Sequence, residues 1–271
     1  MKFSLVMATL GRFEEIKIFL NSLLKQSYNN FELIIIDQND DNRIEQLCLS
    51  YSMNINVVKN TVKGLSANRN IGLKYVTGDI VAFPDDDCEY EANTLENIVL
   101  FFKNNPMYGF YTCNTKEKTG ELSILAKKTD NTVITKNNVM HVGISFTIFI
   151  KTKLIENFLF DEQLGIGAEF GSGEESDLLF YLLKNGNKGY YHSKHYIYHP
   201  YKQDTTEKAF QYGKGYGAVH KKAFLKYKFI NILFLFFFTM FKELFKIIFY
   251  KYSSQRIFTF KGRLFGFNHY R

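Results

Sequence analysis

The sequence predicts an α/β fold with a doubly wound, mostly parallel sheet, followed by a C-terminal helical extension. Short β-branched runs alternate with segments of helical periodicity between residues 3 and 83, which is the pattern of βαβ units. The run at 31–37 (FELIIID) is nearly all apolar, as strands buried on both faces of a parallel sheet are. Residues 202–271 carry a net charge of +11, against −4 for residues 1–201, which marks them as a distinct region.

The hydrophobic periodicity gives the order of the expected elements. Strands are expected at 3–8, 31–37, 55–59 and 79–83, and helices at 14–25, 43–51, 65–76 and from about 93. Beyond residue 106 strands are expected without intervening helices, at 108–114, 123–126, 131–135 and 142–150. A glycine-rich loop at 164–173, a helix at 174–184, short strands at 188–192 and 195–199, and helices at 206–226 and 229–250 complete the chain.

Composition excludes several classes of protein. Of 271 residues, 46% are hydrophobic and 23% charged, which excludes a disordered or collagen-like chain. The three cysteines, at positions 48, 88 and 113, have no CxxC spacing, which favours a reduced, cytoplasmic protein. The apolar N-terminal run is too short for a signal peptide, and it lacks a small-residue cleavage site.

Polar residues follow the buried strands, at Thr9, at Asp37 and at the run of Asp85, Asp86 and Asp87. Ligands bind at the carboxyl ends of parallel strands in such sheets. Three adjacent carboxylates repel one another unless a positive charge neutralises them, and hard divalent cations take oxygen ligands. A solvated acidic turn that caps the following helix is the alternative.

A second acidic pair, Glu174 and Glu175, opens the helix after the glycine-rich loop. A carboxylate at such a place can act as a general base. The alternative is a capping box formed by Ser172 and Glu175, because acidic residues suit any helix N-terminus.

The histidines and one arginine are less specific signals. His199 is either a metal ligand or a partly buried polar residue, and Arg69 binds phosphate or forms a surface salt bridge. His192 and His195 are expected to point in different directions, and they are given no role.

The ordered set of these features resembles the family 2 glycosyltransferases, inverting nucleotide-sugar transferases with the GT-A fold. The resemblance covers about residues 2–201. It is carried by the stretches 4–12, 32–38, 64–72, 78–87, 173–178 and 198–200.

The resemblance implies roles for particular residues. Contacts to the nucleotide are implied for Thr9, Arg12, Asp37, Arg69, Asp85 and Asp86. Asp85, Asp87 and His199 would hold Mn²⁺ or Mg²⁺, and Glu175 matches the general base. Glu175 replaces the usual Asp, so Glu174 stays a candidate for the same role. Ala8 stands where a proline is common in the family.

The tail combines charge with a phenylalanine-rich helix. Residues 229–241 are 13 residues without a charge, short of the ~20 that a membrane span needs. The polar residues of this helix share one face, and lysines flank it, which favours an amphipathic helix in the membrane interface. Packing on the catalytic domain or in a dimer interface is the alternative.

We therefore expect a glycosyltransferase domain at 1–201 and a membrane-associated tail at 202–271. The enzyme would be peripheral on the inner face of the cell membrane and move a sugar from a nucleotide-diphospho-sugar to a glycan or lipid-linked acceptor, in surface polysaccharide biosynthesis. No nucleic acid partner is expected. The alternatives are a sugar-phosphate nucleotidyltransferase and an inactive scaffold protein. A Rossmann dehydrogenase is disfavoured because no GxGxxG follows the first strand.

Overall fold

The structure is a computed structural model that describes residues 1–118, 130–200, 205–249 and 253–271. The described residues belong to two compact units. The first lies within Met1–Lys63, Ala67–Leu159 and Asn185–Tyr201, and the second within Gly64–Ser66, Phe160–Lys184 and Lys202–Arg271. The strand expected at 123–126 lies outside the described residues.

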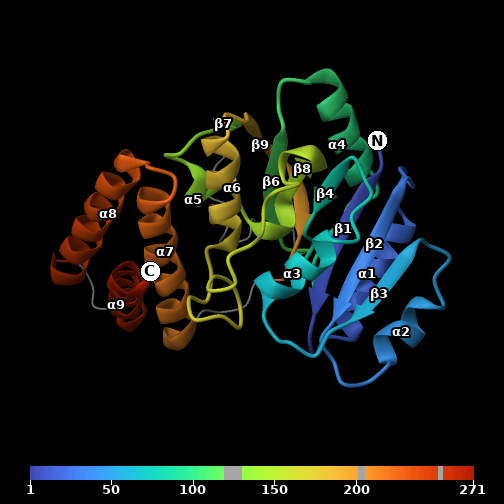
Figure 1. The fold of residues 1–271 in the computed structure, drawn as a ribbon, viewed down its shortest axis with the longest axis horizontal. Coiled ribbons are helices and arrows are strands. Elements are labelled where there is room, and N and C mark those ends of the chain that lie inside the picture. Colours follow the sequence, from blue (N-terminus) through green and yellow to red (C-terminus); the bar gives the residue numbers. More distant parts are fainter. Residues whose placement is uncertain (119–129, 201–204, 250–252) are drawn as a thin grey trace. The chain divides into compact units, whose positions relative to one another are not determined.

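The first unit contains the sheet (Figure 1). Four parallel strands lie side by side in the order β3-β2-β1-β4, with β1 at Phe3–Thr9, β2 at Phe31–Asp37, β3 at Ile55–Lys59 and β4 at Ile80–Ala82. The sheet continues through β8 (Ile148–Lys151), β6 (Phe110–Lys116), β9 (Gly189–Tyr198) and β5 (Glu89–Tyr90), and β7 (Thr132–Ile134) pairs with β9. The predicted α/β class and the parallel first half are confirmed.

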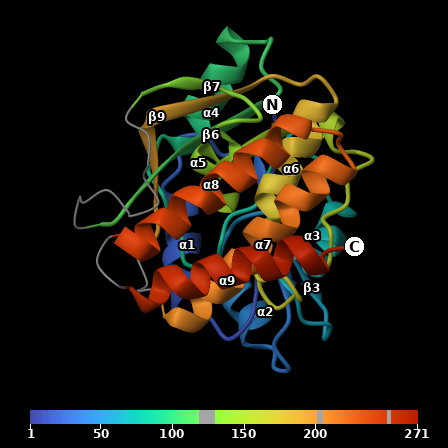
Figure 2. The same cartoon turned by 90° about the vertical axis from the view of Figure 1, so that its left-hand side faces the viewer.

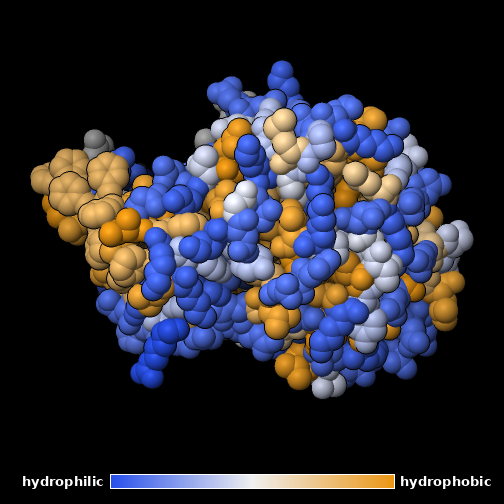
Figure 3. Space-filling model, turned by 45° about the horizontal axis from the view of Figure 1, so that its top comes forward, coloured by the Kyte–Doolittle hydropathy of each residue, from blue (hydrophilic) through white to orange (hydrophobic). Residues whose placement is uncertain are grey.

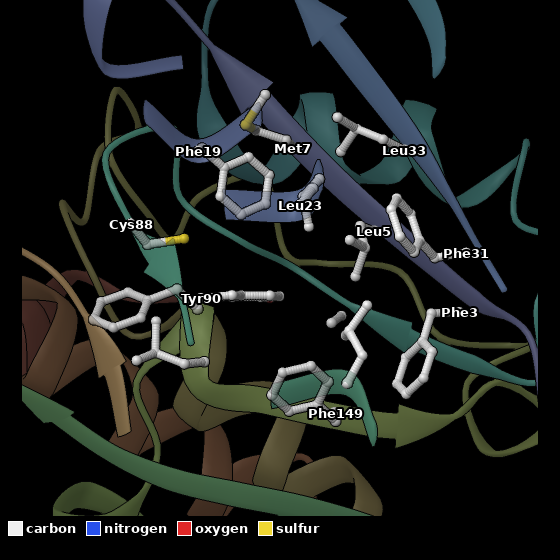
Figure 4. Packing of buried hydrophobic residues seen from close by; sticks show 14 of the residues in the cluster. Phe3, Leu5, Met7, Phe19, Leu23, Phe31, Leu33, Cys88, Tyr90 and Phe149 are labelled. Carbon is white, nitrogen blue, oxygen red and sulfur yellow. The ribbon is translucent and has the colours of Figure 1, made fainter. Parts of the chain in front are cut away.

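Helices cover both faces of the parallel strands. Phe3, Leu5 and Met7 of β1 pack with apolar residues of α1 (Glu14–Leu24), α2 (Arg43–Cys48) and α4 (Thr94–Asn104), and Figure 4 shows part of this core. The opposite face approaches α3 (Leu65–Leu73), where a Cβ on Gly72 would lie 2.3 Å from Val6 Cγ1. The strands β1, β2 and β4 are therefore buried on both sides, as the continuous apolar run of β2 predicts, whereas the edge strand β3 is partly exposed.

The segment 142–150 is not one strand, contrary to the sequence prediction. It contains the end of α5 (Val139–Val142), a 3₁₀ turn at Ser145–Thr147 and the start of β8. The backbone N–H and the hydroxyl of Thr147 both donate to the carbonyl of Ile144, which closes the turn. Apolar content alone does not separate such a turn from a strand.

The two strands expected at 188–192 and 195–199 are one strand, β9, with a bulge. Its pairing with β6 jumps from His192, opposite Cys113, to Tyr196, opposite Asn114. The inserted residues break the simple alternation of side chains, and the rings of His192 and His195 stack with their centroids 3.8 Å apart. The expectation that these two histidines point in different directions is therefore wrong.

The second unit contains α6 (Glu174–Lys184), α7 (Thr206–Leu225), α8 (Ile230–Phe249) and α9 (Ser254–His269), the last three seen in Figure 2. The sequence prediction missed α9. This helix packs closely on α7 through glycines, because a Cβ on Gly217 would lie 2.1 Å from Arg263 O and one on Gly266 would lie 1.9 Å from Lys214 O. The packing of α7 on α9 therefore allows no side chain at these two positions.

The helix α8 has one packed face and one exposed apolar face. Ile232, Phe236 and Met240 are buried, and the ring of Phe236 stacks on Phe267 of α9 at 4.5 Å. The exposed face is formed by Ile230, Phe234, Phe237, Phe238, Phe241, Leu244, Phe245, Ile248 and Phe249, which gather at the left of Figure 3. Among the helices in the described ranges, none is both long and apolar enough to cross a membrane.

Candidate active site

The candidate site begins where the parallel strands of the first unit end. Thr9 and Asp37 are register partners at the carboxyl ends of β1 and β2. The run of Asp85, Asp86 and Asp87 follows β4, which pairs with β1 on its other side. Adjacent parallel strands thus bring these predicted residues to one edge of the sheet.

Asp85, Asp87 and His199 form a cluster that can hold a metal ion. Each offers one ligand atom, and these atoms lie within 4.8 Å of one another. The Nε2 of His199 is 3.0 Å from Asp87 Oδ1 and 4.0 Å from Asp85 Oδ2. Two carboxylates and an imidazole suit a divalent cation, and the partial exposure of Asp85 and His199 leaves an approach for it.

The imidazole of His199 is fixed in place by its neighbours. Its ring stacks on Phe146 with a centroid distance of 4.6 Å and an interplanar angle of 5°. Its backbone N–H donates to Lys116 O, which extends the pairing of β9 with β6. The β9 register therefore places this ligand, and Phe146 sets the plane of its ring.

Asp86 does not join the metal-binding cluster, although it lies between two of its members. Its Oδ2 accepts a 2.8 Å hydrogen bond from the hydroxyl of Thr9. Burial raises the pKa of Asp86 to about 6, against the opposing effects of the Arg12 charge and the Thr9 hydrogen bond. Arg12 also forms an ion pair with Asp87, so Thr9 and Arg12 hold two of the three carboxylates.

Arg69 is a buried residue and not a surface one. It is 1% exposed, and its Nη2 lies 3.2 Å from Asp85 Oδ1. Its guanidinium also lies 5.7 Å from the centroid of the Phe83 ring. The surface salt bridge considered from the sequence is therefore excluded, and Arg69 supplies a positive charge beside the metal-binding cluster.

Asp37 is fully buried and held by two residues that the sequence analysis missed. The backbone N–H and the side-chain amide of Asn39 donate to Asp37 Oδ1, at 3.0 and 2.7 Å. The ammonium of Lys59 lies 2.7 Å from Asp37 Oδ2. The signal for Lys59 was present, because it ends β3 and is the register partner of Asp37.

The second acidic pair lies in the other unit, at the start of α6. Glu174 is 5% exposed, and its carboxylate lies beside Gly165 of the glycine-rich loop, where a Cβ would be 3.3 Å from Oε2. Glu175 is less buried than Glu174. The hydroxyl of Ser172, proposed above as a cap, donates to Tyr212 O at 3.1 Å. The two glutamates have their predicted place in the first turn of a helix.

Residues 4–159 match the family described as glycosyl transferase family 2. A curated relative from Escherichia coli, UDP-Glc:alpha-D-GlcNAc-diphosphoundecaprenol beta-1,3-glucosyltransferase WfgD, is 33% identical over 68% of this chain and 70% of its own length. Another, an uncharacterized glycosyltransferase of Haemophilus influenzae, matches over 36% of its length.

Solved structures share the fold. The chain resembles Staphylococcus aureus TarS 1–349 in complex with UDP-GlcNAc with a TM-score of 0.67 and 20% identity, over 83% of this chain and 67% of that one. It also resembles the mannosyltransferase PcManGT from Pyrobaculum calidifontis in complex with GDP-Man and Mn²⁺, with a TM-score of 0.64 and 15% identity, over 82% and 64%.

Proposed function

The chain belongs to glycosyl transferase family 2 and is a glycosyltransferase, and we propose that it moves a sugar from a nucleoside-diphosphate sugar to a hydroxyl of a lipid-linked or glycan acceptor, in the synthesis of a surface polysaccharide. The E. coli relative's name gives a UDP-sugar donor and a diphosphoundecaprenol-linked acceptor, which supports this choice of substrates.

The metal-binding cluster is the observation that carries the proposal. Asp85, Asp87 and His199 would hold Mn²⁺ or Mg²⁺, which neutralises charge on the diphosphate leaving group when bound. The positive charges of Arg12 and Arg69 flank the same carboxylates. Asp37, Thr9 and Asp86 would contact the nucleoside at the neighbouring strand ends, so the donor site lies within residues 1–201.

The acceptor hydroxyl needs a base. We assign this role to Glu175, with Glu174 as the alternative, because both open α6 and Glu175 is the more exposed of the two. The carboxylate takes the hydroxyl proton as the acceptor oxygen bonds to the anomeric carbon. The bond from that carbon to the diphosphate oxygen breaks, the nucleoside diphosphate leaves, and the single displacement inverts the anomeric centre.

Residues 202–271 would associate with the cytoplasmic face of the cell membrane. The apolar face of α8 is exposed although the helix is packed on its other side, and Lys242 and Lys246 lie beside it. Apolar burial and attraction of lysines to anionic lipid act together in such helices. A membrane-bound enzyme of this kind meets a lipid-linked acceptor in the plane where that acceptor resides.

The product of the reaction tests the class of enzyme. With UDP-, dTDP- and GDP-sugars, Mn²⁺ and a lipid-linked acceptor, the protein should release a nucleoside diphosphate and not pyrophosphate.

Substitution of the glutamates tests the base. Glu175→Gln should lower turnover by ~10²–10⁴ and leave the donor dissociation constant nearly unchanged. An inactive Glu174→Gln beside an active Glu175→Gln would move the assignment by one residue.

Glu207→Gln is the matched control, since Glu207 also lies in the first turn of a helix, α7, and is exposed. It should keep full turnover. Release of pyrophosphate would instead identify a nucleotidyltransferase, and donor binding without any turnover would identify a scaffold protein.

A further inference from the structure

A closed polar cluster lies in the second unit. The ammonium of Lys222, on α7, lies 2.7 Å from Asp177 Oδ2 and 2.8 Å from Asp161 Oδ2. The side chains of Asp177 and Lys222 are 1% and 7% exposed. One lysine thus joins a carboxylate of α6 to a carboxylate that precedes the glycine-rich loop.

Two tyrosine hydroxyls complete the cluster. Tyr227 donates to Asp177 Oδ1 at 2.7 Å, and Tyr270 donates to Asp161 Oδ2 at 2.6 Å. Tyr270 is the second-last residue of the sequence and is 1% exposed, packed against Leu164, Phe170 and Ala218. Burial acts to raise the pKa of Asp161, but the hydrogen bonds from Lys222 and Tyr270 outweigh it and lower that pKa.

The cluster acts on the part of α6 that carries the candidate base. Asp177 lies two residues after Glu175, in the same first turn. The start of this turn also lies against α7, because a Cβ on Gly173 would be 3.0 Å from Gly215 O. A fixed carboxylate at Asp177 therefore restricts both the rotation and the position of the first turn.

Stability alone does not account for such a cluster. Removing charged groups from water is costly, and an apolar replacement of similar volume is often as stable. What hydrogen-bonded charges add is a defined geometry, because each oxygen has a directional partner. A catalytic carboxylate needs such geometry, since a displacement of 1 Å costs about 10²-fold in rate.

We propose that Lys222 and Tyr270 are positioning residues for the base at the start of α6. The last residues of the tail then belong to the catalytic apparatus, because Tyr270 holds Asp161, Asp161 shares Lys222, and Lys222 holds Asp177. The proposal rests on the proposed function, in which a glutamate of this turn takes the acceptor proton.

The test is the Tyr270→Phe variant in the full-length protein. It removes one hydroxyl and keeps the ring that packs in the apolar cluster. We expect kcat to fall by about 10- to 100-fold, with the donor KM and dissociation constant unchanged. Lys222→Met should lose at least as much turnover, and Lys222→Arg should recover part of it, because the charge is restored.

Met240→Ala is the control for stability. Met240 is 5% exposed on the packed face of α8, and its truncation destabilises the same unit without touching the cluster. Its kcat, measured well below its melting temperature, should stay near that of the parent. An equal loss of kcat in Met240→Ala and Tyr270→Phe would overturn the positioning role.

A double-mutant cycle separates this proposal from the proposed function. In the background of the inactive glutamate variant, Tyr270→Phe should cause little further loss, because the base through which it acts is gone. If Tyr270→Phe lowers turnover by the same factor in both backgrounds, the positioning role is overturned and the assignment of the base is kept. Parental turnover in both Glu174→Gln and Glu175→Gln overturns the base and the positioning role together.

Discussion

Two clusters of acidic side chains, one in each unit, differ in what satisfies their oxygens. Asp85 and Asp87 lie beside the imidazole of His199 and are flanked by Arg69 and Arg12, and the side chain of Asp85 is 29% exposed. Asp161 and Asp177 share the ammonium of Lys222 and each accept from a tyrosine hydroxyl, with the Asp177 side chain 1% exposed. The first cluster is partly exposed and can admit an ion from solution, whereas the second is buried around the ammonium of Lys222.

This difference separates two uses of the same residue type. Converging ligand atoms with partial exposure favour the exchange of a metal ion and a charged ligand. Carboxylates saturated by buried donors favour a fixed geometry. The sequence shows acidic residues at a strand end and at a helix start in either case, and their partners decide which use applies.

Among the tests of this contrast, the largest expected effect comes from loss of the metal-binding cluster. Asp87→Asn keeps the shape of the side chain but removes the charge that faces His199 and Arg12. Donor binding should lose its dependence on Mn²⁺ or Mg²⁺, and turnover should fall by about 10²–10³-fold, as for other lost electrostatic contacts to a developing charge. Calorimetry with and without EDTA, together with a transfer assay, measures both.

Asp41→Asn is the matched control in the same unit. Asp41 forms an ion pair with Arg43, and its side chain is 45% exposed. It should leave metal dependence and turnover unchanged, as an exposed ion pair contributes little. If the parent protein binds the donor equally well with the divalent ion and in excess EDTA, the cluster is not a metal site. Neither acidic cluster would then admit an ion.

The first half of the fold could be predicted because its signals are local. Each of the strands β1, β2 and β3 is followed by a helix of recognisable period, and parallel pairing then brings Thr9, Asp37 and the aspartates to one edge. Tyr270 and Lys222, which the sequence analysis also missed, act over long separations. Tyr270 bonds to a residue 109 positions away, and Lys222 to residues 61 and 45 away.

The wrong predictions for α9 and β9 have the same physical origin. The helix α9 has a weak apolar period because glycines, not large side chains, line its contact with α7. The bulge in β9 reverses the side-chain alternation on which the expectation for His192 and His195 rested. Periodicity predicts elements that bury large side chains in a regular array, and these two do not.

The next effect concerns vesicle binding by the exposed apolar face of α8. Phe241 is 67% exposed on this face, away from the packed residues. Phe241→Ser should weaken binding to anionic vesicles by about 10- to 150-fold, because burial of a phenylalanine contributes about 1.5–3 kcal/mol. Lys242→Gln should weaken it by about 1 kcal/mol, and salt should reduce that difference. Vesicle sedimentation at two salt concentrations measures both.

Leu49→Ser serves as the control, because Leu49 is 83% exposed in the first unit and lies outside the proposed membrane face. It should bind vesicles as the parent does. If the parent does not bind anionic vesicles, α8 packs on another protein surface instead. The two units would then differ only in their acidic clusters.

The last effect is on stability alone, and it comes from a buried histidine of the helical unit. His220 on α7 is fully buried, its Nδ1 lies 2.7 Å from Tyr216 O, and its ring packs between Tyr216 and Phe236. Burial lowers the pKa of His220 to about 4, and the charge of Arg263 acts in the same direction. In the unfolded chain the imidazole has its ordinary pKa of about 6.5.

The sign of the effect follows from proton binding. Between about pH 6.5 and 4 the unfolded state binds a proton at His220 that the folded state does not, so the protein loses stability as the pH falls through this range. At pH 5.5 the loss should be about 1.2 kcal/mol relative to neutral pH. His220→Phe keeps the ring stacking and cannot titrate, so its melting temperature should fall less on acidification than that of the parent.

Two other histidines serve as internal checks. His192 of the first unit, whose pKa is also lowered to about 4, is present in the parent and in His220→Phe, so its effect cancels when their melting temperatures are compared. The exposed His269 on α9 gives the control, since His269→Phe should follow the parent at every pH. Parallel melting curves for His220→Phe and the parent would mean that protons reach His220 in the folded state, and that the helical unit is less closed than its acidic cluster indicates.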